Sequence, residues 1–123
     1  MLGSQKLMAF VATRDSARAQ SFYQDVLGLR LVADEEWAVV FDANGTMLRI
    51  QKVREMTAAP YTALGWQVPD IRRAVSSLRE KKVPFERYPF LEQDEAGIWT
   101  APGGAKVAWF KDPDGNLLSL TQF

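Results

Sequence analysis

The sequence predicts an α+β domain assembled from two βαβββ modules, and three observations support this fold class. An apolar strand, an amphipathic helix and further strands occur twice along the chain in the same order. Two expected helix N-caps, Asp15 and Asp70, lie 70 − 15 = 55 positions apart. Two expected hairpin glycines, Gly45 and Gly115, lie 115 − 45 = 70 positions apart. The 123 residues fit a single domain, 1–123.

The first module, about residues 5–55, begins with the apolar run Leu7–Val11, which is short enough for a buried strand. Asp15 can cap the helix that follows, and Gly28 predicts where that helix ends. Asn44-Gly45 is a strong hairpin signal between the last two of three further strands. These strands are expected at Leu29–Ala33, Trp37–Phe41 and Met47–Val53.

The second module, about residues 61–123, follows a candidate linker at Arg54–Pro60. Asp70 predicts the start of its helix, and Asp-Pro-Asp-Gly-Asn at 112–116 predicts a tight turn. Its strands are expected at Ala63–Val68, Val83–Tyr88, Gly97–Ala101, Val107–Phe110 and Leu117–Thr121.

Composition narrows the classes of function. Fifteen basic and fifteen acidic residues leave no net charge, which disfavours a nucleic-acid partner. The chain has no cysteine, so it has no disulfide, thiolate ligand or cysteine nucleophile, and it has no histidine, the commonest metal ligand and general base. It has no membrane-length apolar run and no signal-like N-terminus. We therefore expect a cytoplasmic protein that does not bind membranes.

Two motifs resemble those of the vicinal-oxygen-chelate superfamily, which includes glyoxalases, bleomycin-resistance proteins and extradiol dioxygenases. The first is Phe22-Tyr23 followed by Val26-Leu27-Gly28-Leu29, and the second is the aromatic-then-turn sequence Trp109–Asn116. The resemblance covers roughly Gln5 to Phe123. It implies that the two sheets curl into a partly open cup with helices outside, and that the protein forms a homodimer.

Members of that superfamily usually chelate a divalent metal in the cup. The resemblance places the four ligand positions here on Met8, Arg49, Ala63 and Ser119, with Gln51 replacing Arg49 if the fourth strand shifts by two residues. The Met8 thioether is a soft ligand, and the Arg49 guanidinium is a fixed cation. The Ala63 methyl group has no donor atom, and the Ser119 hydroxyl is a weak ligand. The departure from the family pattern implies no metal and no other cofactor.

Strand alternation predicts which side chains face the cup. It directs Leu7, Ala9, Val11, Leu64, Trp66 and Val68 toward the helices or core. Ala63 and Gly65 are small and leave volume for a ligand, unless a neighbouring side chain fills it. The predicted ligand-binding residues are Met8, Phe10, Arg49, Ala63, Gly65, Gln67, Tyr88, Phe90 and Ser119.

Arg49 and the loop Tyr88–Leu91 each have two interpretations. Inside the cup, Arg49 needs an internal carboxylate or an anionic ligand; otherwise it forms an ordinary salt bridge or faces solvent. The loop either covers the mouth of the cup and stacks on a flat ligand, or it is a plain surface loop. Most of the strand and loop aromatics are expected in the core: Trp37, Trp66, Phe85, Tyr88, Phe90, Trp99 and Trp109.

The leading hypothesis is a metal-free small-molecule-binding protein of the glyoxalase/bleomycin-resistance type, with an aromatic or anionic organic ligand. A second hypothesis is a metal-independent lyase or isomerase, in which Glu86 is the candidate carboxylate base and Arg49 anchors a substrate anion. Glu36, Asp42, Glu92 and Tyr88 are further candidates for catalysis. A third is a scaffold that acts through protein contacts alone.

Overall fold

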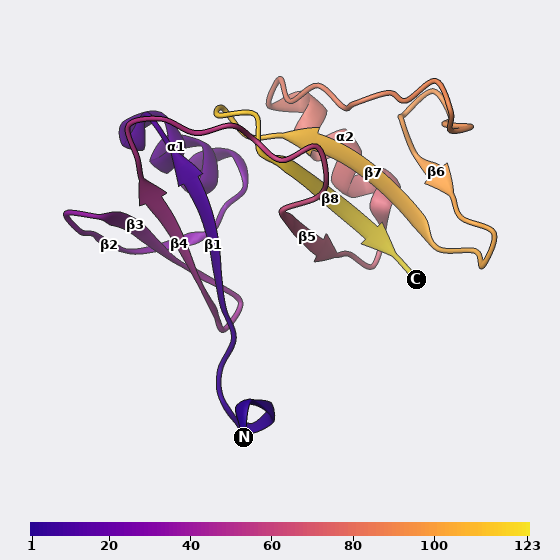
Figure 1. Ribbon diagram of the computed structural model, residues 1–123. Helices are drawn as coiled ribbons and strands as arrows, with labels where there is room; N and C mark the ends of the chain where they lie inside the picture. The colour runs from indigo at the N-terminus through magenta and orange to yellow at the C-terminus, as the bar shows by residue number, and fades with distance from the viewer. The chain divides into compact units, whose positions relative to one another are not determined.

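The computed structural model describes residues 1–123, which divide into two compact units, Met1–Thr57 and Ala58–Phe123 (Figure 1). Each unit is one four-stranded mixed sheet with a helix packed on one of its faces. Each also has the order strand, helix, three strands. The predicted α+β class and its two βαβββ modules are therefore confirmed.

In the first unit the sheet order is β1-β4-β3-β2, with β1 parallel to β4 and the other pairs antiparallel. The helix α1 continues directly into a π-helical turn, η2, and a short 3-10 turn, η1, precedes the first strand. The elements are η1 (Leu2–Ser4), β1 (Met8–Thr13), α1 (Ser16–Ser21), η2 (Phe22–Val26), β2 (Arg30–Asp34), β3 (Ala38–Ala43) and β4 (Thr46–Lys52).

Local sequence signals explain how these elements begin and end. The Asp15 carboxylate accepts a hydrogen bond from the Arg18 amide at 3.2 Å, so it caps α1 as predicted. Asn44 and Gly45 have φ angles of 51° and 96°, which a two-residue hairpin turn between right-twisted strands requires. One expectation was wrong: Leu7 precedes β1 and is 78% exposed instead of facing the helix.

In the second unit the sheet order is β5-β8-β7-β6, with β5 parallel to β8. The elements are β5 (Leu64–Gln67), α2 (Ile71–Glu80), β6 (Trp99–Thr100), β7 (Lys106–Lys111) and β8 (Leu117–Gln122). The Asp70 carboxylate caps α2 by accepting from the Arg73 amide at 3.1 Å. No helix in residues 1–123 is long and apolar enough to cross a lipid bilayer.

The predicted strand Val83–Tyr88 was wrong. This segment has only an isolated bridge, between Phe85 and Phe110, beside one hydrogen bond from the Glu86 amide to the Trp109 carbonyl at 2.8 Å. Pro84 has no amide hydrogen to donate to a neighbouring strand, so pairing cannot extend through it. A strand here would have given the second unit four strands after its helix. Because the segment is irregular, the unit has three, as the first unit does.

The pairing register confirms the repeat residue by residue. Phe10 pairs with Arg49 across β1 and β4, and Gly65 pairs with Ser119 across β5 and β8. The two pairs are related by the shifts found in the sequence, 65 − 10 = 55 and 119 − 49 = 70. Equivalent residues of the two modules therefore occupy equivalent places in two separate sheets.

The core of each unit lies between the helix and one face of its sheet, which leaves the other face of each sheet open. In the first unit the buried residues on the helix side are Val11, Thr13, Ala19, Tyr23, Val39, Phe41, Leu48 and Ile50. Ala38 and Val40 are also buried, although their pairing with Gln51 and Arg49 places them on the other side of the sheet. In the second unit they include Ile71, Val75, Ala108, Phe110, Leu118 and Leu120. The predicted direction of Val11 toward the helix is thus confirmed. We call the opposite side of each sheet its open face.

Candidate functional site

Three predicted site residues, Met8, Phe10 and Arg49, lie together on the open face of the first sheet. Phe10 is directly opposite Arg49 in the β1–β4 register, and Met8 is opposite Met47. Phe10 and Met8 are 44% and 45% exposed. Alternation along the strands separates these side chains from buried Val11, so this face carries apolar side chains that its own helix does not cover.

Arg49 is engaged in a salt bridge on that face. Its Nη2 lies 3.1 Å from Oε1 of Glu35, and the Arg49 side chain is 28% exposed. Because the Glu35 side chain is 51% exposed, this contact is the ordinary salt bridge that the sequence left open as an alternative to an internal carboxylate or an anionic ligand. A partly exposed ion pair of this kind contributes only about 0–1 kcal/mol, so a ligand anion can replace Glu35 at little cost.

Four further predicted residues belong to the second sheet. Gly65 and Gln67 lie on its open face with Ser119, and Ala63 immediately precedes β5, where its amide donates to the Leu117 carbonyl at 2.8 Å. A Cβ on Gly65 would lie 2.8 Å from the Ser119 Oγ. The space that the glycine leaves is therefore partly occupied by the Ser119 hydroxyl, and less of it is open than the small side chains suggested.

Four aromatic side chains meet beside this face, and we call Tyr88, Phe90, Trp99 and Trp109 the aromatic cluster. The register pairs Trp109 with Ser119, which places Trp109 on the open face. Its ring centroid lies 5.5 Å from that of Tyr88, edge to face, and 6.1 Å from that of Trp99. Phe90 packs against Tyr88 at 5.6 Å and is 79% exposed.

The sequence-based expectation that most of these aromatics lie in the core was wrong. None of the seven is among the fully buried residues, and Trp37 and Phe90 are largely exposed. Trp99 and Trp109 were consequently missed as site residues. A signal for Trp109 was present, because pairing across the turn at 112–116 places it opposite Ser119.

Charged groups adjoin the aromatic cluster at Tyr88. A cavity of about 300 Å³ is lined by Glu86, Tyr88 and Lys111 together with residues 58–60, Gly115 and Leu117. The Lys111 Nζ lies 3.4 Å from the Glu86 Oε1. Burial and then the Glu86 carboxylate raise the pKa of the Tyr88 phenol, against the opposing effect of Lys111. The phenol is therefore a hydrogen-bond donor at neutral pH.

A second cavity, of about 690 Å³, lies in the first unit. The N-terminal residues 4–8 form one side of it, and residues of β2, β3 and β4 near the Asn44-Gly45 turn form the other. Met8 and Met47 contribute apolar surface to this cavity, and Arg30 and Asp42, whose charged groups approach to 3.6 Å, contribute polar surface.

The side chains at the family's metal positions do not fit a divalent cation. Met8 and Ala63 offer a thioether and a methyl group, the Ser119 hydroxyl is neutral, and Arg49 is a cation bound to Glu35. Neither unit places three or more Asp or Glu side chains so that they could hold a metal ion. The donor set thus disagrees with the metal chemistry that the resemblance attaches to this fold.

Comparison with known proteins identifies one family. A model of the Glyoxalase/Bleomycin resistance protein/Dioxygenase superfamily matches residues 7–120. No curated protein sequence matches the chain.

Several solved structures share the fold at low sequence identity. A lactoylglutathione lyase from Agrobacterium tumefaciens is 18% identical, with a TM-score of 0.73, over 96% of this chain and 93% of that one. A glyoxalase family protein from Bacillus anthracis is 14% identical, with a TM-score of 0.77, over 97% and 94%. A fosfomycin resistance protein, FosX, from Listeria monocytogenes is 13% identical, with a TM-score of 0.77, over 98% and 93%.

Proposed function

Because the chain belongs to the Glyoxalase/Bleomycin resistance protein/Dioxygenase superfamily, we propose that it is a metal-free protein that binds a small aromatic or anionic organic molecule in the cup that this family implies. The observation that carries the proposal is the aromatic cluster beside the open face of the second sheet. Exposed rings such as Phe90 provide area on which a flat ligand can stack, and each aromatic pair contributes about 0.5–1.5 kcal/mol beyond its buried area.

In the first unit, Arg49 is the candidate partner for an anionic ligand. The guanidinium offers several donors in a fixed planar arrangement, and its present partner Glu35 is 51% exposed. Exchange of this carboxylate for a sulfonate or carboxylate on the ligand keeps the charge of Arg49 compensated. The remaining predicted residues would supply apolar and small surfaces within each unit: Met8 and Phe10 beside Arg49 in the first, and Ala63, Gly65, Gln67 and Ser119 beside the aromatic cluster in the second.

The proposal is tested by thermal unfolding in the presence of defined probes. We expect naphthalene-2-sulfonate to raise the melting temperature more than methanesulfonate, which carries the charge without the ring. Zn²⁺, Ni²⁺ and Mn²⁺ should leave the melting temperature unchanged, because the chain lacks a coordination set. Stabilisation by any of these metals to the same extent as by the aromatic anion would refute the proposal.

Two variants assign the binding to its residues. Trp109→Leu should weaken binding of naphthalene-2-sulfonate about two- to twelvefold, since loss of one aromatic pair costs about 0.5–1.5 kcal/mol. Trp37→Leu is the matched control, because Trp37 is 72% exposed and lies outside the aromatic cluster. Equal effects of the two substitutions on affinity would contradict the assignment.

A metal-independent lyase or isomerase is the second candidate, and one observation favours it. Glu86 and the protonated Tyr88 phenol share one cavity, where a carboxylate can accept a proton and a phenol can donate one. Wild-type protein should then exchange α-hydrogens of 2-oxo acids for deuterium in D₂O, and Glu86→Gln should abolish this exchange, as followed by ¹H NMR. Exchange that persists in Glu86→Gln would remove Glu86 as the base.

We also propose that the protein forms a homodimer. Light scattering coupled to gel filtration should give twice the mass of 13.9 kDa that one chain has. A mass of one chain at micromolar concentration would contradict it.

A further inference from the structure

We propose that Gln93 is a positioning residue that fixes the aromatic cluster before any ligand binds, so that Tyr88 and Phe90 form a rigid wall and not a loop that closes over the ligand. The inference rests on the proposed function in one respect only, the kind of ligand that this wall binds. Whether the wall is rigid is a property of the free protein.

The Gln93 side chain uses both ends of its amide on backbone groups. Its Oε1 accepts a hydrogen bond from the Tyr88 amide at 2.7 Å. Its Nε2 donates to the Glu86 carbonyl at 3.0 Å and to the Gly97 carbonyl at 2.9 Å. Because the segment Val83–Tyr88 is irregular, it lacks the backbone hydrogen bonds of a paired strand. The half-buried Gln93 side chain supplies hydrogen bonds in their place.

These hydrogen bonds reach the cluster from both sides. The bond to the Tyr88 amide fixes the residue whose ring packs edge to face on Trp109. The bond to Gly97 and the isolated bridge between Gln93 and Trp99 fix the start of β6, whose Trp99 ring also packs on Trp109. The Gln93 amide bonds to backbone groups and not to the rings, so it acts on the cluster through Tyr88 and Trp99.

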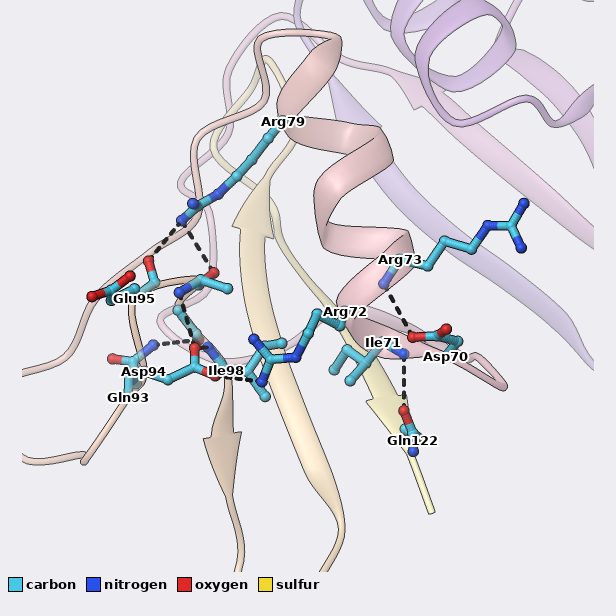
Figure 2. Close-up of polar contacts among 12 residues, drawn as sticks. Asp70, Ile71, Arg72, Arg73, Arg79, Gln93, Asp94, Glu95, Ile98 and Gln122 are labelled. Atoms are coloured by element: carbon cyan, nitrogen blue, oxygen red, sulfur yellow. Dashed lines mark hydrogen bonds and ion pairs between the residues drawn. The ribbon is translucent and has the colours of Figure 1, made fainter.

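The loop that carries Gln93 is itself attached to α2, as Figure 2 shows. The Arg72 guanidinium donates to Asp94 Oδ2 at 2.8 Å, and Arg79 donates to the Ala96 carbonyl at 3.1 Å. Asp94 Oδ1 accepts from the Ala96 and Ile98 amides at 3.0 and 2.9 Å. With its neighbours bonded in this way, Gln93 has a fixed position relative to the helix, which a hinged lid would not have.

Arg87 strengthens the attachment from the other direction. Its guanidinium Nη2 donates to the carbonyls of Asp94 and Glu95 at 2.7 and 2.8 Å. Arg87 lies directly before Tyr88 in the chain, so the segment that carries the wall is bonded to the loop through its backbone and through a side chain. A closing motion of Tyr88 and Phe90 would have to break both sets of bonds.

Amide hydrogen exchange, measured by NMR on the ligand-free protein, tests the inference. We expect the wild-type Tyr88 amide to be protected, because it is bonded to Gln93 Oε1. Gln93→Leu should accelerate this exchange about fivefold, since a typical hydrogen bond contributes on the order of 1 kcal/mol. Glu95→Gln is the matched control, because the Glu95 side chain is exposed two residues further along the same loop, and exchange of the Tyr88 amide in this variant should equal that of the wild type.

A spectroscopic reading separates positioning of the rings from general loss of structure. Gln93→Leu should lower the pKa of the Tyr88 phenol toward its ordinary value of 10.0, since the raised pKa depends on burial against its neighbours. Tyr88→Phe identifies the titration that belongs to this phenol. A pKa of Tyr88 that is unchanged in a folded Gln93→Leu protein would overturn the inference.

Two further results complete the test. Wild-type exchange of the Tyr88 amide at the rate of an unprotected loop amide would overturn the inference even if Gln93→Leu cannot be folded. Naphthalene-2-sulfonate should bind Gln93→Leu about fivefold more weakly than Glu95→Gln, the fold-change expected for loss of about one hydrogen bond. Absence of binding to wild type would count against the proposed function, whereas a protected Tyr88 amide would still support the positioning role.

Discussion

Asp112 illustrates how a single residue fixes a large part of the second unit. Its carboxylate is only 6% exposed and accepts three hydrogen bonds within one turn. Oδ1 accepts from the Asp114 and Asn116 amides, both at 2.9 Å, and Oδ2 accepts from the Asn116 Nδ2 at 2.8 Å. This turn sets the β7–β8 register and therefore places Trp109 opposite Ser119.

Substitution of Asp112 should therefore be costly. We expect Asp112→Ala to lower the free energy of unfolding by about 2–3 kcal/mol, because hydrogen bonds to a charged group are lost and the amides of the turn are left without an acceptor. Asp112→Asn keeps one acceptor oxygen but brings its amide hydrogens against Asn116, so its cost should be intermediate. Urea unfolding measures both, and a cost of Asp112→Ala below about 0.5 kcal/mol would show that the turn forms without it.

At the level of single residues, the sequence predicted the positions that act through local geometry. Asp15 and Asp70 are helix caps, and Gly28 adopts a φ of +75° at the end of the first helix. The partner of Arg49 could not be predicted, because Glu35 is 14 positions away in the turn between two strands. A side-chain ion pair of that separation depends on tertiary structure and leaves no periodic signal in the sequence.

Among the elements, β5 and β8 pair two predicted site residues, Gly65 and Ser119, directly opposite each other. A Cβ on Gly65 would lie 2.8 Å from the Ser119 Oγ, and no other atom of Ser119 except its carbonyl oxygen, at 3.7 Å, is near it. We expect Gly65→Ala to cost about 1–2 kcal/mol, as overpacking does. In Ser119→Ala the obstructing oxygen is absent, so the double variant should recover most of that loss.

The double-mutant cycle isolates this contact from the separate effects of each substitution. It requires the unfolding free energies of wild type, Gly65→Ala, Ser119→Ala and the double variant. A coupling energy near zero would mean that the Ser119 hydroxyl rotates away freely. In that event the glycine would have no packing role in the sheet.

The loop between α2 and β6 should respond to acid through Asp94. Burial raises the pKa of Asp94, but hydrogen bonds from the Ile98 and Ala96 amides and from Arg72, together with the Arg72 charge, outweigh it and lower the pKa below 3.8. The folded pKa is thus below the unfolded value of about 3.9. The stability contributed by this carboxylate is present above about pH 4 and is lost as pH falls through the folded pKa.

Chemical shifts of the Ala96 and Ile98 amides can follow this titration. Both should change with a common midpoint below pH 3.8, and Arg72→Gln should raise that midpoint by removing the neighbouring positive charge. Asp94→Asn should make both shifts independent of pH in this range. Midpoints above 3.8 in the wild type would contradict the inferred balance of causes.

The same loop shows why one element could not be predicted. Val83–Tyr88 has the apolar and aromatic residues of a strand, yet Pro84 lacks an amide hydrogen and the Gln93 side chain takes the place of a neighbouring strand. Alternation of apolar and polar residues indicates that one side of a segment is buried. An irregular segment that packs on a sheet also has one buried side, so the pattern does not distinguish it from a strand. The strands that do form had clear turn signals at their ends, such as Asn44-Gly45 and 112–116.

For the whole chain, the two-module repeat and the superfamily were both predictable from sequence, and both are confirmed. Whether the chain is a single cooperative domain stays a prediction. Its two compact units have 57 and 123 − 57 = 66 residues. Units of about 60 residues bury only about 60% of the surface that their unfolded chains expose, so each alone would be marginally stable. In the first unit, Met8, Phe10 and Met47 remain 40–45% exposed, which reduces its own hydrophobic stabilisation further.

We therefore expect the full chain to unfold in a single transition, because each unit alone would be only marginally stable. The four tryptophans permit a direct test, since Trp37 lies in the first unit and Trp66, Trp99 and Trp109 lie in the second. With 5-fluorotryptophan incorporated, ¹⁹F NMR should show all four native signals lost at the same urea concentration. A midpoint for Trp37 that is separate from the other three would mean that the modules are independent domains.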